Sequence, residues 1–86
     1  MIREEMRSPI KMTIKNAISI NRFCERMGTQ FMMKLGHDNM IRLNSLLSTA
    51  SCGLRKGEKI CLYVDKDDPM AETKLKELMR QFESLA

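Results

Sequence analysis

The amino-acid sequence predicts an α+β fold, an open-faced sandwich in which three helices cover one face of a four-stranded antiparallel sheet. Segments in which apolar and polar residues alternate are interleaved with segments of helical apolar spacing, in the order β-α-β-β-α-β-α. Alternating strands have one solvated face, which suits an antiparallel sheet covered on its other face. The 86 residues suffice for one small domain, expected over residues 9–86 after an extended or flexible N-terminal arm over residues 1–8.

The first strand and the first helix are expected within residues 10–27. Residues 10–14 (IKMTI) alternate between apolar and polar side chains, which predicts a strand with one buried face. Residues 19–27 (SINRFCERM) have apolar side chains at the spacing i, i+3, i+4, i+7, which predicts a helix. Ser19 is a suitable N-cap for this helix, and Gly28 suits the position just after its end.

A β-hairpin is expected to follow the first helix. Residues 29–35 (TQFMMKL) alternate, and a second short alternating segment follows at residues 40–43. Between them, Gly36-His37-Asp38-Asn39 has the composition of a hairpin turn. We therefore interpret His37, the single histidine, as a turn residue.

The second half of the chain contains a short helix and the clearest strand. Residues 45–52 are expected to form the helix, ended by Gly53. Residues 58–65 (EKICLYVD) alternate, with Cys61 and Tyr63 on the face opposite to Ile60, Leu62 and Val64. This pattern predicts that Cys61 and Tyr63 lie on the uncovered face of the sheet.

The last helix is predicted from a start signal and an apolar stripe. Asp68-Pro69 reads as an N-cap followed by proline at the first helical position. The stripe that should face the sheet consists of Ala71, Leu75, Leu78, Met79 and Phe82.

Composition and charge exclude several classes of protein. The chain has no apolar run of the roughly 20 residues needed to cross a bilayer, and its polar N-terminus does not resemble a signal peptide. Its three cysteines, Cys24, Cys52 and Cys61, lack CxxC spacing, so we expect no metal site, no cofactor and a reducing, cytoplasmic location. The net charge of +4 permits an acidic partner without indicating nucleic acid.

Beyond these patterns, residues 10–85 resemble the HPr family, the small phosphocarrier proteins of the bacterial sugar phosphotransferase system. The similarity is most specific over residues 45–65, where Ser45-Leu46-Leu47 resembles the family's serine-initiated helix. Gly53-Leu54-Arg55-Lys56-Gly57 resembles the glycine-bracketed turn into its last strand. The resemblance implies the open-faced sandwich already predicted from the patterns.

The chain departs from the family at the site of its chemistry. The family's phosphorylated histidine belongs to a His-x-Arg-Pro stretch just before the first helix. One alignment places Ser19 at the histidine, Asn21 at the arginine and Arg22 at the proline, whereas a second places Asn16 at the histidine. Neither supplies an imidazole, and His37 is expected far from that helix. We therefore expect no histidine phosphocarrier activity and no catalytic residue.

The resemblance also implies two regulatory features. In the family, the serine that opens the short helix is a regulatory phosphorylation site, which makes Ser45 the candidate here. The apolar residues behind it form a docking patch, represented here by Leu46 and Leu47, with Arg22, Arg55 and Lys56 as basic neighbours. Ser45 is equally explained as an ordinary helix cap, and Asn44 stands where the family usually has a basic residue.

The sequence thus predicts a non-enzymatic regulatory or protein-binding module. Partners implied by the resemblance are a phosphotransferase-system enzyme, an HPr kinase or a transcription factor of carbon regulation, with neither nucleic acid nor membrane. Two alternatives remain open at this point. The chain could be an active phosphocarrier that uses a residue other than histidine, or a small basic nucleic-acid-binding domain, although its few aromatic residues argue against base stacking.

Overall fold

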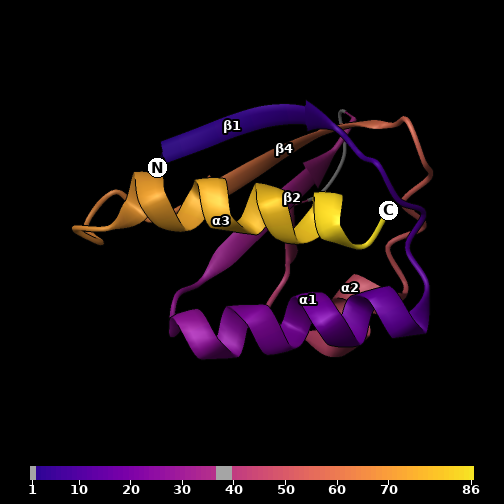
Figure 1. The fold of residues 1–86 in the computed structure, drawn as a ribbon, viewed down its shortest axis with the longest axis horizontal. Helices are drawn as coiled ribbons and strands as arrows, with labels where there is room; N and C mark the ends of the chain where they lie inside the picture. Colours follow the sequence, from indigo (N-terminus) through magenta and orange to yellow (C-terminus); the bar gives the residue numbers. More distant parts are fainter. Residues whose placement is uncertain (1, 37–39) are drawn as a thin grey trace.

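The computed structural model describes residues 2–36 and 40–86, and the chain folds there as an open-faced sandwich (Figure 1). His37 and the rest of the expected hairpin turn lie outside the described residues. Within these ranges the elements are β1 (Ile2–Arg7), α1 (Ile14–Met27), β2 (Phe31–Leu35), β3 (Met40–Arg42), α2 (Leu46–Ala50), β4 (Lys59–Val64) and α3 (Ala71–Ser84). Their order, β-α-β-β-α-β-α, is the predicted one.

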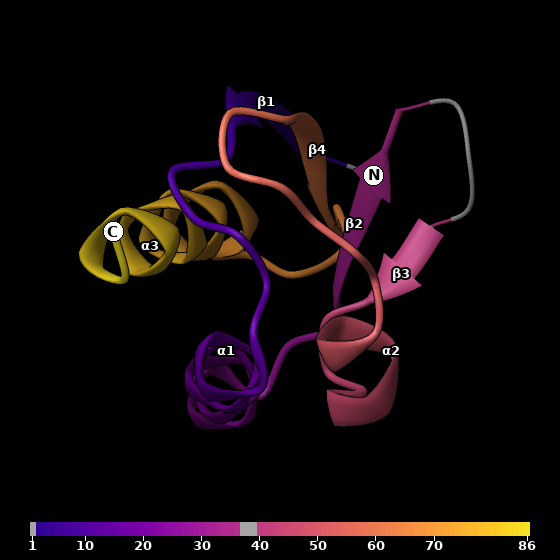
Figure 2. The ribbon, with the colours of Figure 1, turned by 90° about the vertical axis from the view of Figure 1, so that its right-hand side faces the viewer.

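The strands form one antiparallel sheet in the spatial order β1-β4-β2-β3. The three helices lie on the same side of this sheet, and its other face is uncovered (Figures 1 and 2). Because β4 is central, its inward side chains Ile60, Leu62 and Val64 are buried, whereas Cys61 and Tyr63 are only partly covered. The predicted fold class and the predicted faces of this strand are confirmed.

The core lies between the sheet and the helices. Helix α3 packs on β1 and β4, and α1 packs between α3 and α2. Each element contributes its apolar face, and the largest fully buried side chains include Phe31, Phe82, Ile20, Met33, Leu62, Leu75 and Leu78. The stripe predicted for α3 supplies Ala71, Leu75, Leu78 and Phe82 to this core, with Met79 partly buried beside it.

The prediction of a first strand over residues 10–14 is wrong. The first strand is β1, which lies within the segment expected as an arm and pairs with β4 from Ile2–Val64 to Arg7–Lys59. Its alternation is masked in the sequence because Glu4 occupies one of the inward positions. Residues 2–7 are therefore part of the domain.

The segment between β1 and α1 is a loop held against the loop before β4. The backbone N–H of Ser8 donates to the carbonyl of Glu58 at 2.8 Å, and the N–H of Gly57 donates to the carbonyl of Ser8 at 2.7 Å. The N–H of Met12 then donates to the carbonyl of Leu54 at 2.9 Å. These bonds bring residues 54–58 beside the start of α1.

The N-cap of helix α1 lies six residues earlier than predicted. Its N-cap is Thr13, whose hydroxyl oxygen accepts a 3.1 Å hydrogen bond from the N–H of Asn16. Ser19, the predicted N-cap, lies inside the helix. At the other end, Gly28 has a left-handed backbone (φ 62°) and its N–H donates to the carbonyls of Cys24 and Glu25, as predicted for that glycine.

Helix α3, in contrast, begins two residues later than its sequence signal predicts. Its N-cap is Met70, not Asp68. The Asp68 carboxylate instead accepts a 2.8 Å hydrogen bond from the N–H of Met70 and forms a 2.7 Å ion pair with Lys74. The Thr29 hydroxyl also donates to this carboxylate at 3.0 Å. The bond from Lys74, followed by that from Met70, lowers the pKa of Asp68. This network joins the start of α3 to Thr29, two residues before β2.

Candidate functional site

Two helices, α1 and α2, lie side by side at the end of the molecule away from β1 (Figure 2). Asn21 lies on the side of α1 that faces α2, because its amide donates a 2.6 Å hydrogen bond to the carbonyl of Asn44. Ile14 and Ile18 precede Asn21 by seven and three residues, so helical periodicity places them on the same side. Ile14 has 71% of its surface exposed.

Helix α2 presents the two leucines that the sequence singled out. Leu47 is 79% exposed and Leu46 is 43% exposed, so neither is a core residue. The core contact of α2 is made instead by Thr49, which is fully buried and whose hydroxyl donates to the carbonyl of Ser45 at 2.7 Å. A helix of five residues that buries a threonine leaves its leucines free to contact another molecule.

Asn44 fixes the start of α2 against the sheet. Its side-chain amide donates to the carbonyl of Thr29 at 2.8 Å, and its side-chain oxygen accepts from the N–H of Phe31 at 2.9 Å. With the bond from Asn21, this residue links α1, α2 and the beginning of β2. Asparagine at this position is explained by these contacts, which a long basic side chain would not make.

Ser45 is the N-cap of α2, as the capping interpretation predicted. Its hydroxyl oxygen accepts a 3.3 Å hydrogen bond from the N–H of Ser48, and the residue is partly exposed. The cap explains the serine without any regulatory role. It also leaves the hydroxyl at the surface, where a modifying enzyme could reach it.

The loop after α2 carries two cations and is bonded to the segment that precedes α1. Leu54 is buried and its carbonyl accepts the bond from Met12, whereas Arg55 and Lys56 are exposed. Gly53 and Gly57 both have positive φ (76° and 86°), a conformation that glycine adopts without strain. The two cations thus lie in an exposed turn whose flanking residues are bonded to Ser8 and Met12, in the segment that leads into α1.

We define the α1–α2 surface by its exposed apolar residues and their basic neighbours: Ile14, Leu46, Leu47, Lys15, Arg22, Arg55 and Lys56. All are exposed, and within residues 2–36 and 40–86 none of the four cations forms an ion pair. Unpaired cations around exposed apolar side chains suit a protein partner with acidic residues around an apolar centre. Ile14 and Lys15 were not predicted as members of this surface, because the helix was expected to begin only at Ser19.

The residue immediately before the first helix is Thr13. Ser19 and Asn16, the two positions aligned with the family's histidine, both lie within α1 and not before it. Those alignments therefore lose their structural basis. The signal that could have found Thr13 is the buried set Ala17, Ile20 and Cys24, which continues the helical spacing back toward residue 14.

The three cysteines are buried or partly buried. The described residues contain no cluster of His, Cys, Asp and Glu side chains suited to a metal ion. Cys24 is fully buried, and burial raises the pKa of its thiol to about 12. Burial also raises the pKa of Cys52, which is partly buried after α2. Neither thiol is a ready nucleophile. No helix in the described ranges combines the length and apolarity needed to cross a bilayer.

Comparison with solved structures identifies the fold as HPr-like. HPr-C-His from Thermoanaerobacter tengcongensis superposes with a TM-score of 0.79 at 17% identity, covering 98% of this chain and 93% of that one. The phosphocarrier protein HPr from Bacillus anthracis gives 0.78 at 13% identity, with 94% and 95% covered. The Bacillus subtilis catabolite repression protein Crh, a dimer with a swapping domain, gives 0.71 at 12% identity, with 98% and 95% covered.

At the sequence level, no family model matches the chain, and no curated protein shows significant similarity to it. The similarity therefore lies in the arrangement of the elements and extends over nearly the whole of both chains.

Proposed function

We propose that this chain is a non-enzymatic regulatory module of the HPr type, which binds a protein partner through its α1–α2 surface and does not relay phosphoryl groups. The proposal rests on one observation, that the N-cap of α1 is Thr13. The resemblance puts the family's histidine just before the first helix, which supports Thr13 as its counterpart, and Ile14, Leu46 and Leu47 are exposed.

A threonine at this place is chemically unsuited to a phosphoryl relay. A hydroxyl needs a base to become a nucleophile, and the hydrogen bond formed by the Thr13 side chain in the described residues comes from the N–H of Asn16. A phosphothreonine ester is also too stable to pass its phosphoryl group on, in contrast to a phosphoramidate. Lys15, two residues further on, follows the spacing of the arginine in His-x-Arg-Pro, so a cation is retained without the nucleophile.

The partners we propose follow from the resemblance and from the similar structures. They are an enzyme of the phosphotransferase system, an HPr kinase acting on Ser45, or a transcription factor of carbon regulation. The fold is shared both with HPr phosphocarriers and with Crh, described as a catabolite repression protein, so the preference for a regulatory role rests on Thr13, in place of an imidazole, before α1. Location in the cytoplasm is part of this proposal.

The direct test is phosphorylation by the family's upstream enzyme. We expect the wild-type chain to keep its mass unchanged after incubation with phosphoenolpyruvate and that enzyme, because no imidazole stands before α1. Intact mass spectrometry at neutral and at acidic pH measures this, with an authentic HPr protein as the positive control. An acid-labile gain of one phosphoryl group would overturn the proposal in favour of an active phosphocarrier.

Leu47→Asp is expected to abolish partner binding without unfolding the protein. Leu47 is 79% exposed, and surface substitutions usually change the free energy of unfolding by less than about 0.5 kcal/mol, whereas a carboxylate at the centre of an apolar contact is strongly unfavourable there. Retention of proteins from the source cell's extract on the immobilised chain is the measurement.

Met70→Asp is the matched control, since Met70 is a 52% exposed apolar residue at the start of α3, outside the α1–α2 surface. It should retain the same proteins as the wild-type chain. Equal retention by both variants would show that binding does not use α2.

Ser45 is expected to accept a phosphate from an HPr kinase and ATP, whereas Ser45→Ala is not. The added phosphate would lie at the N-terminus of α2, near unpaired backbone N–H groups. Loss of the cap should lower the free energy of unfolding by about 1 kcal/mol, which leaves the variant folded. Ser48→Ala, one turn along the same helix, is the control and should be labelled. Equal labelling of wild type and Ser45→Ala would reject this site.

A further inference from the structure

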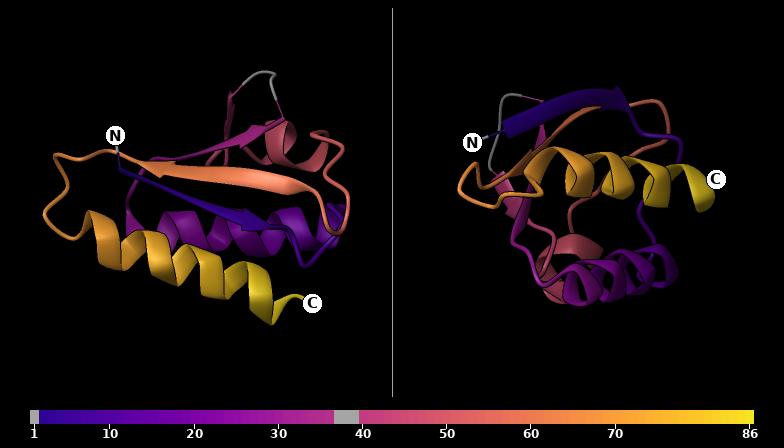
Figure 3. Two further views of the ribbon diagram at one scale, coloured as in Figure 1. Left: turned by 90° about the horizontal axis from the view of Figure 1, so that it is seen from above. Right: turned by 60° about the vertical axis from the view of Figure 1, so that its left-hand side comes forward.

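The face of the sheet opposite the helices is uncovered (Figure 3). The strand register places the residues of this face in rows that cross the strands. The first row crosses all four strands and begins near the N-terminus. It consists of Arg3 on β1, Tyr63 on β4, Met32 on β2 and Arg42 on β3. The next row consists of Glu5, Cys61, Lys34 and Met40. Arg7 and Lys59 form a third, shorter row.

The uncovered face is basic. Its five cations and one carboxylate give it a net charge of +4. The carboxylate, Glu5, forms a 3.3 Å ion pair with Lys59, both side chains being more than half exposed. This positive charge would attract an anionic ligand to the face.

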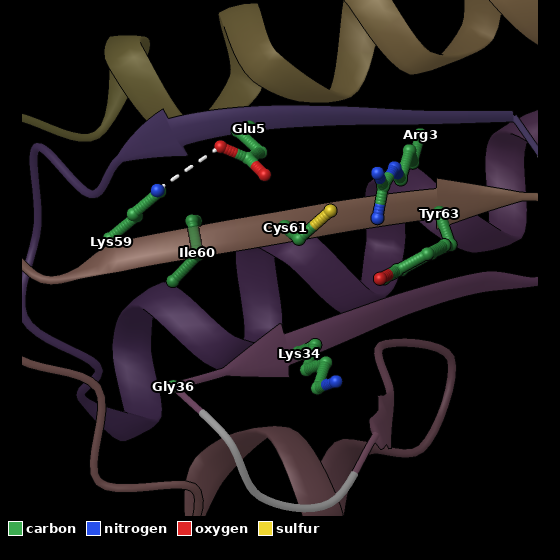
Figure 4. A pocket seen from close by; sticks show the side chains of 8 residues that line it. All are labelled: Arg3, Glu5, Lys34, Gly36, Lys59, Ile60, Cys61 and Tyr63. Carbon is green, nitrogen blue, oxygen red and sulfur yellow. Dashed lines mark ion pairs between the residues drawn. The ribbon is translucent and has the colours of Figure 1, made fainter.

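Three of these cations, Arg3, Lys34 and Lys59, line a shallow hollow of about 380 Å³ around Cys61 and Tyr63 (Figure 4). Tyr63 and Cys61 are partly buried at its floor. The phenol of Tyr63 raises the pKa of Arg3, so the guanidinium remains charged. At the opposite edge, the guanidinium of Arg42 donates a 3.1 Å hydrogen bond to Gln30, which limits its movement.

The spacing of the first row fits an extended peptide. Arg3 and Arg42 are three inter-strand steps apart, about 14 Å at roughly 4.8 Å for each step. In an extended segment, residues i and i+4 lie on the same side and are about 13 Å apart. A peptide crossing the strands can thus place carboxylates near both arginines and an apolar side chain over Tyr63 and Met32.

We propose that this open face binds an extended acidic segment of a partner protein with the pattern acidic–x–apolar–x–acidic. The surface is distinct from the α1–α2 surface, so the proposal goes beyond the proposed function. A protein segment fits better than single-stranded nucleic acid because the described face has one aromatic platform, Tyr63, where successive bases need several. Glu5 in the second row would also repel a phosphate backbone.

The test is a titration of the ¹⁵N-labelled chain with the blocked pentapeptide Glu-Ser-Leu-Ser-Glu, followed by NMR. We expect saturable shifts of the amide signals of β1, β2 and β4, and no response to the matched peptide Gln-Ser-Leu-Ser-Gln. The double substitution Arg3→Gln and Arg42→Gln should weaken binding roughly tenfold, since each exposed charge pair contributes up to about a factor of five.

The matched control is the double substitution Lys11→Gln and Arg26→Gln, which removes the same charge from exposed positions outside both surfaces and should leave the affinity within about twofold. Equal weakening by both double variants would show a nonspecific charge effect and overturn the proposal. Shifts confined to α1 and α2, or none, would also overturn it. If a uridine oligonucleotide binds the same residues more tightly than the peptide, the ligand of this face is nucleic acid and the proposal of a protein segment is overturned.

Discussion

Phe31→Ala is expected to lower the free energy of unfolding by about 3–5 kcal/mol, the usual cost of removing a fully buried phenylalanine. Phe31 has none of its surface exposed, and its ring centroid lies 5.9 Å from that of Phe23. The pair joins β2 to α1, so the cavity would open directly beneath the helix that supplies half of the α1–α2 surface. In a domain of this size, such a loss removes much of the total stability.

Urea denaturation followed by circular dichroism measures the effect. The control is Met32→Ala, on the same strand but on the uncovered face of the sheet, which should cost less than about 1 kcal/mol. Similar midpoints for Phe31→Ala and Met32→Ala would contradict the placement of Phe31 in the core. If Phe31→Ala also loses partner binding at temperatures where it is folded, the position of α1 contributes to that binding.

The second half of the fold was predictable because its sequence patterns and its burial agree. In β4, each apolar residue on one side, such as Leu62, is buried, and the intervening Tyr63 is partly exposed. The alternation therefore reports the faces of a strand with one neighbouring layer. The capping role of Ser45 was predictable for a similar reason, since a short polar side chain at a helix start satisfies a local backbone N–H.

The first half was mispredicted where burial does not follow the pattern. Ile10 and Met12 are buried, but in a loop whose backbone bonds to the loop before β4. Ile14 continues their alternation although it is 71% exposed, so an apparent strand runs into what is a helix. In β1, Glu4 at an inward position hides a real strand. Partners distant in sequence determine these segments, and local patterns do not report them.

In the candidate site, too, features set by the local sequence were predictable and features set by distant residues were not. Leu46 and Leu47 were singled out because the family resemblance implies a docking patch behind the serine. Both are exposed, and their contact with a partner stays a prediction. Thr13 was missed because its role depends on where α1 begins. The bonds of Asn44 to Thr29 and Phe31 depend on strand β2, fifteen and thirteen residues away, so no local motif indicates them.

Thr13→His is expected to convert the chain into an acceptor of a phosphoryl group from the family's phosphorylated upstream enzyme. The substitution would place an imidazole, nucleophilic near neutral pH, at the N-cap of α1. The free N–H groups of the first helical turn favour a bound phosphate there, and the cation of Lys15 is close in sequence. Loss of the threonine cap costs about 1 kcal/mol, so the variant should remain folded. Intact mass spectrometry should show one acid-labile phosphoryl group.

Ser19→His is the control that separates the two placements of the family's histidine. Ser19 lies inside α1, where the backbone N–H groups are already bonded within the helix, so an imidazole there has no phosphate-binding helix end beside it. We expect no labelling of this variant. Labelling of Ser19→His but not of Thr13→His would restore the alignment through Ser19. Adding Leu47→Asp to Thr13→His should then suppress labelling if the upstream enzyme docks on the α1–α2 surface, because phosphoryl transfer requires the two proteins to be held in contact.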